Sequence, residues 1–120
     1  MVVTGDRIQL QQVVLNLLMN AMDAMAESAP DQRVAVVSTL VTADGVHLSV
    51  RDAGTGLRQS DAGRVFQPFY TTKPSGMGMG LSIARSIVEA HGGRIWGRDN
   101  AGPGATFTFS LPLSTAPPPA

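Results

Sequence analysis

The 120-residue sequence contains no cysteine, which excludes disulfide bonds, thiolate metal sites and thiol catalysis. The absence fits a reducing compartment, and we expect a cytoplasmic location. An excess of charge of either sign is missing too, because nine basic residues balance nine acidic ones. The charge balance therefore gives no indication of nucleic-acid binding.

Long hydrophobic runs are also missing. Residues 13–25 form the most apolar stretch, but Asn16, Asn20 and Asp23 interrupt it, and a membrane-spanning helix needs about 20 apolar residues. No signal peptide is visible, and we expect no direct membrane insertion. The length allows one domain with a single core. We expect that domain over residues 1–113 and a disordered Pro/Ala-rich tail over 114–120.

Hydrophobic periodicity predicts the elements. Helical spacing covers residues 6–27, with Asp6 and Gln9 in the pattern of a capping box, and returns at residues 81–91 before Gly92 and Gly93. Strands are expected at 33–41, 46–51, 94–97 and 105–111. This order predicts an α/β (α+β) two-layer sandwich, a mixed, mainly antiparallel sheet with helices on one face. Three apolar side chains are expected in its core: Ile83, Ile87 and Trp96.

A polar stripe follows one face of the first helix, at Gln12, Asn16, Asn20, Asp23 and Glu27. A solvated face is the ordinary explanation for such a stripe. Asparagine is a poor helix former, however, because its amide competes for backbone hydrogen bonds. Two asparagines in the middle of a helix therefore favour a functional role for the stripe.

Two glycine-containing segments are the other candidates. Residues 52–56, Asp-Ala-Gly-Thr-Gly, follow a strand directly, and an ordinary turn explains them as well as a binding site does. Residues 76–80, Gly-Met-Gly-Met-Gly, open the last helix, where backbone N–H groups can hold phosphate oxygens. This second segment fits neither the P-loop nor the dinucleotide-binding pattern, and a flexible hinge is the alternative.

Taken in order, these segments resemble the ATP-binding catalytic domain of two-component sensor histidine kinases, in the GHKL superfamily. Residues 16–24 resemble the N box, 52–56 the first glycine box, and 66–69 the F box. Residues 71–73 and 76–81 resemble the end of the ATP lid and the second glycine box, and 102–106 resemble the closing glycine-threonine element. The residues at 66–69, 71–73 and 89–93 are most similar to those of the oxygen- and nitrogen-sensing types of bacterial histidine kinase.

The resemblance implies roles for single residues. Asp52 would accept a hydrogen bond from the amine of adenine, with Thr106 supporting it, and Asn20 would ligate Mg²⁺. Asn16 and Lys73 would be the catalytic residues. Asn16 stands where hydrolysing relatives carry a water-activating glutamate, and Lys73 is a mobile cation for the phosphates. The implied nucleotide contacts are Asn20, Asp23, Asp52, Gly54, Gly56, Thr72, Lys73, Gly76, Gly78, Gly80, Leu81 and Thr106.

The implied function is transfer of the γ-phosphoryl group of ATP, with Mg²⁺, to a histidine on a separate dimerisation and phosphoacceptor domain, with a response regulator downstream. Neither His47 nor His91 has the context of an acceptor histidine. A hydrolysing GHKL ATPase or an anti-sigma serine kinase is one alternative, against which Asn16 argues. An interaction module that has lost its nucleotide is another, against which the intact set of motifs argues.

Overall fold

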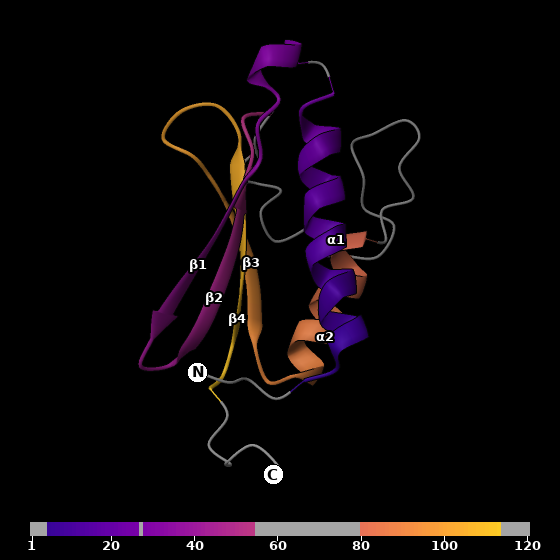
Figure 1. The fold of residues 1–120 in the computed structure, drawn as a ribbon, viewed down its shortest axis with the longest axis vertical. Coiled ribbons are helices and arrows are strands. Elements are labelled where there is room, and N and C mark those ends of the chain that lie inside the picture. The colour runs from indigo at the N-terminus through magenta and orange to yellow at the C-terminus, as the bar shows by residue number, and fades with distance from the viewer. Residues whose placement is uncertain (1–4, 27, 55–79, 114–120) are drawn as a thin grey trace.

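The structure, a computed structural model, describes residues 5–26, 28–54 and 80–113. Two helices cover one face of a four-stranded sheet (Figure 1), which confirms the expected two-layer sandwich. The strands lie in the order β1-β2-β4-β3, and the three pairings between them are all antiparallel. The elements are α1 (Arg7–Ala24), the 3₁₀ helix η1 (Pro30–Gln32), β1 (Val36–Thr42), β2 (Gly45–Arg51), α2 (Gly80–Ala90), β3 (Arg94–Asp99) and β4 (Ala105–Leu111).

Helix α1 begins where the sequence predicts it. The side chain of Asp6 accepts a hydrogen bond from the backbone N–H of Gln9 at 2.9 Å and so caps the helix. Val13, Leu17 and Ala21 are at most 1% exposed and form the face that packs on the sheet. Within the described part of the chain, neither helix has the length and apolarity needed to cross a membrane.

Helix α2 ends at the predicted glycine pair. Gly92 has φ +77°, its N–H donates to the carbonyl of Glu89, and the N–H of Gly93 donates to the carbonyl of Val88. A Cβ on Gly93 would lie 1.9 Å from the carbonyl oxygen of Ser110, so only glycine allows this approach to β4. The pair therefore turns the chain directly from α2 into β3.

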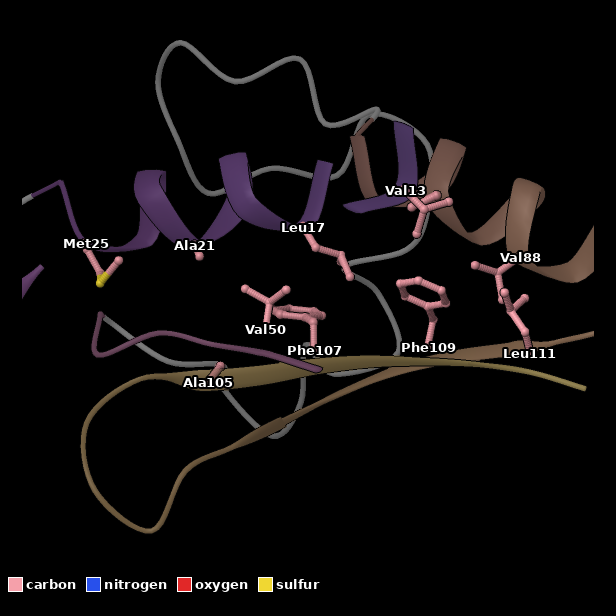
Figure 2. Packing of buried hydrophobic residues seen from close by; sticks show 11 residues of the cluster. Val13, Leu17, Ala21, Met25, Val50, Val88, Ala105, Phe107, Phe109 and Leu111 are labelled. Carbon is pink, nitrogen blue, oxygen red and sulfur yellow. The ribbon is translucent and has the colours of Figure 1, made fainter. Parts of the chain in front are cut away.

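Strand β4 supplies most of the sheet side of the core. Its odd-numbered residues face the helices together with Val50 of β2, and the core lies between them (Figure 2). The even-numbered residues lie on the opposite, helix-free face, where the hydroxyls of Thr108 and Ser49 are hydrogen bonded at 2.8 Å. Four residues of β4 are therefore buried beneath α1 and α2, namely Ala105, Phe107, Phe109 and Leu111.

Two of the expected core residues lie elsewhere. Trp96 pairs with Thr108 and therefore lies on the helix-free face, where the Arg94 guanidinium is 5.3 Å from its ring centroid and His47 meets it edge-on. Ile83 is 41% exposed, because Ala84 and Val88 form the buried face of α2. Ile87 does pack against the core as expected.

A pair of leucines on α1 tests this division between buried and exposed faces. We expect Leu17→Ala to lower the free energy of unfolding by about 2–5 kcal/mol, because the cavity it leaves is fully enclosed. Leu15 is 50% exposed, and Leu15→Ala is expected to cost less than about 1 kcal/mol. Urea unfolding followed by circular dichroism measures both. Equal losses for the two variants would contradict the orientation of α1.

Candidate functional site

Asp52 lies directly after β2 and is 2% exposed. Its backbone N–H continues the pairing with β4 by donating to the carbonyl of Ala105 at 2.9 Å. Its carboxylate oxygen Oδ1 accepts from the N–H groups of Gly54, at 2.9 Å, and Ala105, at 3.2 Å. The other oxygen, Oδ2, is buried and has no hydrogen-bond partner among the residues that the structure describes. An unmatched buried acceptor costs about 1–3 kcal/mol, so Oδ2 is suited to receive a donor from a ligand.

The turn that carries Asp52 is pressed against the end of α1. A Cβ on Gly54 would lie 2.2 Å from the carbonyl oxygen of Ala24, which leaves no space for a side chain. The N–H of Ala53 also approaches the sulfur of Met25 at 3.5 Å. Glycine at position 54 therefore has a steric reason that the sequence alone does not reveal.

The turn between β3 and β4 closes over Asp52 from the other side. Gly104 has φ +91°, and a Cβ there would lie 2.1 Å from the carbonyl oxygen of Asp52. The side-chain amide of Asn100 donates to that same carbonyl at 2.9 Å, and the hydroxyl of Thr106 donates to Asn100 Oδ1 at 2.5 Å. Thr106, which the resemblance places in support of Asp52, is thus connected to it through Asn100.

A second contact joins the middle of α1 to the first residue of α2. The amide nitrogen of Asn16 donates to the carbonyl of Gly80 at 2.9 Å, and its oxygen accepts from the side chain of Gln12 at 2.8 Å. Asn16 is 9% exposed. Its amide therefore fixes the segment containing the N box to the segment containing the second glycine box, which lie 64 residues apart in the sequence.

Helix α1 connects the contact of Asn16 with Gly80 to the contact of Ala24 with Gly54. Ala24 lies eight positions after Asn16, which corresponds to a rise of about 12 Å along the helix. Asn20 lies between them and is partly buried, and its side chain makes no hydrogen bond in the part of the chain that the structure describes. Asp23 lies one turn further along and is exposed. An uncommitted amide oxygen between two anchored ends is available to a ligand.

The structure thus brings the predicted residues into two groups along α1: Asp52 and Gly54 near its end, and Asn16 and Gly80 near its middle. Leu81 packs against the core beside Gly80. Five predicted residues lie outside the described ranges, namely Gly56, Thr72, Lys73, Gly76 and Gly78. Sequence reasoning missed Asn100 and the N–H of Ala105, because the first lies in the connection between two predicted strands and the second carries no side-chain signal.

Comparison with known proteins agrees with this geometry. The family described as histidine kinase-, DNA gyrase B-, and HSP90-like ATPase matches residues 5–115, and the chain belongs to that family. Sensor protein FixL of Bradyrhizobium diazoefficiens is 50% identical over 112 residues, which are 93% of this chain and 22% of FixL. Sensor protein TdiS of Thauera aromatica is 38% identical over 109 residues, 89% of this chain and 20% of TdiS. The chain thus spans about a fifth of these relatives.

Solved structures give the same result. The catalytic domain of histidine kinase ThkA in a nucleotide-free form has a TM-score of 0.79 and 35% identity, over 92% of this chain and 70% of that one. Full-length ShkA, solved in complex with AMPPNP, has a TM-score of 0.76 and 30% identity, over 93% of this chain and 23% of that one. The expected resemblance to sensor histidine kinases and the expected fold are confirmed.

Two glycine variants test the close approach to α1. We expect Gly54→Ala to lower the free energy of unfolding by about 1–3 kcal/mol, because backbone atoms of Ala24 or of the Asp52 turn must shift. Gly102 provides the matched control, since a Cβ there meets no atom within 4 Å. Gly102→Ala is expected to change stability by less than about 0.5 kcal/mol. Urea denaturation compares the two, and a Gly54→Ala variant as stable as the control would contradict the contact.

Proposed function

We propose that this chain binds ATP with Mg²⁺ and is the catalytic domain of a histidine kinase, which donates the γ-phosphoryl group to a histidine on a separate domain. The observation that carries the proposal is the buried Oδ2 of Asp52, which has no hydrogen-bond partner within the described ranges. Family membership and the likeness to two solved structures support it, because ThkA is a histidine kinase with this fold and ShkA was solved in complex with AMPPNP. We also propose a cytoplasmic location, where ATP is available.

The chemistry of Asp52 suits adenine. An ionised carboxylate only accepts hydrogen bonds, and the exocyclic amine of adenine is a donor. Guanine presents a carbonyl oxygen at the corresponding position, so that two acceptors would face each other. Because Oδ1 is already occupied by two N–H groups, Oδ2 alone would select the base. Selectivity for adenine over guanine follows from this arrangement.

The residues along α1 suit the phosphate end of the ligand. Asn20 would offer its free amide oxygen to Mg²⁺, which prefers oxygen ligands and is usually shared between protein and phosphates. When bound, Mg²⁺ neutralises negative charge on the triphosphate. No cluster of three or more His, Asp or Glu residues occurs in the described ranges, which fits a metal held mainly by the nucleotide. Lys73 is proposed to add a further positive charge.

Asn16 is proposed to favour transfer over hydrolysis. Its amide cannot act as a general base, and both of its ends are engaged, with Gly80 and Gln12. The residue therefore holds the start of α2 in place without activating water. A GHKL ATPase that hydrolyses its ATP needs a base at this position, and this chain does not provide one there.

The acceptor histidine is proposed to lie on a dimerisation and phosphoacceptor domain, with a response regulator as the next partner. Both ring nitrogens of His91 are engaged, because one accepts from the N–H of Asp6 at 2.9 Å and the other donates to the carbonyl of Ile87 at 2.8 Å. His47 packs edge-on against Trp96 in the middle of the sheet. Neither histidine is presented for phosphoryl transfer.

Calorimetric titration of the purified chain with ATP, and with GTP as the control nucleotide, tests the proposal. We expect selective binding of ATP by the parent and a loss of about 100-fold, or about 3 kcal/mol, in Asp52→Asn. In that variant an NH₂ group would replace the Oδ2 acceptor and face the amine of adenine. Asp44→Asn, an exposed turn substitution of the same chemistry, is the control. A parent that binds ATP and GTP equally would refute the adenine assignment.

The metal assignment is tested separately at Asn20. We expect Asn20→Ala to reduce the enhancement of ATP binding by Mg²⁺ about tenfold, or about 1.4 kcal/mol, while metal-free binding changes little. Titrations with and without Mg²⁺ give this ratio directly. Gln11→Ala, at an exposed position of the same helix, controls for a change in helix propensity. If both variants kept the parent ratio, Asn20 would not be a metal ligand.

A further inference from the structure

Asn100 uses its whole side chain to close the turn between β3 and β4. Its amide nitrogen donates both hydrogens, to the carbonyls of Asp52 at 2.9 Å and Pro103 at 3.0 Å. Its amide oxygen accepts from the hydroxyl of Thr106. Its backbone N–H donates to the carbonyl of Gly104 at 3.0 Å. A turn needs only the last of these bonds, so the bond to Asp52 requires another explanation.

That bond completes a set of constraints on Asp52. The N–H of Asp52 is held by the carbonyl of Ala105, and Oδ1 is held by the N–H groups of Gly54 and Ala105. The carbonyl is held by Asn100, which lies 48 residues away in the sequence. The direction in which Oδ2 points follows from these bonds together. Because all of them come from within the protein, the orientation exists before any ligand binds.

The carbonyls of Asp52 and Pro103 determine which way the amide of Asn100 faces. An amide side chain can be turned over, which exchanges its donor and acceptor ends. In the flipped orientation the amide oxygen would face two carbonyl oxygens, which only accept, whereas in the observed orientation both carbonyls receive a donor and the hydroxyl of Thr106 donates to Oδ1. The three bonds therefore support one another, and Asn100 has a single favourable orientation.

We propose that Asn100 is a positioning residue for base selectivity, which holds the Asp52 carboxylate in the orientation that distinguishes adenine from guanine. The proposal rests on the proposed function of Asp52 and adds to it. Asn100 does not touch the base itself. Thr106 contributes through Asn100, which gives a physical reason for a threonine in this position that does not require a contact with the nucleotide.

Nucleotide selectivity separates this role from a purely structural one. Asn100→Asp has nearly the same shape and keeps the acceptor for Thr106, but it places a carboxylate oxygen against the carbonyls of Asp52 and Pro103. We expect ATP binding about tenfold weaker and a correspondingly smaller ratio of ATP to GTP affinity. The enhancement by Mg²⁺ is expected to stay at the parent value, because the metal site on α1 is not disturbed.

Thr108→Val is the matched control. The substitution removes the hydrogen bond between the hydroxyls of Thr108 and Ser49. Thr108 lies on the same strand as Thr106, but its hydroxyl makes no bond to Asp52 or to the β3–β4 turn. We expect it to lower stability without changing the ratio of ATP to GTP affinity. Calorimetry with ATP and GTP, each with and without Mg²⁺, measures these quantities, and circular dichroism confirms that each variant is folded.

The outcomes distinguish a failure of the positioning role of Asn100 from a failure of the proposed function of Asp52. A folded Asn100→Asp variant with the parent ratio of ATP to GTP affinity would overturn the positioning role while leaving the function of Asp52 intact. A parent that binds no ATP would overturn the proposed function and this inference with it. If Asn100→Asp does not fold, Thr106→Val decides, since it removes one of the bonds that hold Asn100 and leaves its amide oxygen without that donor. We expect it to reduce the same ratio, and an unchanged ratio would overturn the proposal.

Discussion

The rest of the candidate site depends on one buried carboxylate, that of Asp52, with one oxygen satisfied by the protein and the other without a partner in the described part of the chain. Burying a charged group without full pairing is unfavourable, by about 1–3 kcal/mol for the missing hydrogen bond alone. The fold tolerates this because Asp52 follows directly on a central strand and is fixed by neighbours on both sides. Gly54 and Gly104 each allow backbone to approach at distances that no side chain permits.

Helix α1 links this carboxylate to the start of α2. One of its faces forms the core, at Val13 and Leu17, and an adjoining face carries the asparagines. Because the buried face is anchored by packing, the polar face has a fixed position along the helix axis. The Asn16 amide then ties that position to Gly80. The core therefore holds the proposed base end of the site at a set separation from the proposed phosphate end on α1.

Much of the fold could be predicted from the sequence. The Asp6 cap, the glycine pair after α2 and the bounds of β4 follow from local rules of capping and alternation. The wrong face for Trp96 has a simple cause: Ile95 and Trp96 are both apolar, and only the register against β4 decides which one points to the helices. Asn100 could not be assigned from sequence, because a turn-favouring asparagine looks the same whether or not its side chain reaches a residue 48 positions away. Motifs in the sequence thus indicate the candidate residues, whereas the long-range contacts that support them can be assigned only from the structure.

A structure of the chain determined with ADP tests the central claim most directly, because it shows what Oδ2 of Asp52 receives. The account predicts that the amine of adenine lies within about 2.7–3.2 Å of Oδ2, with the N–H groups of Gly54 and Ala105 still on Oδ1. Adenine seated away from Asp52, or Oδ2 satisfied by a protein group while nucleotide is bound, would contradict it.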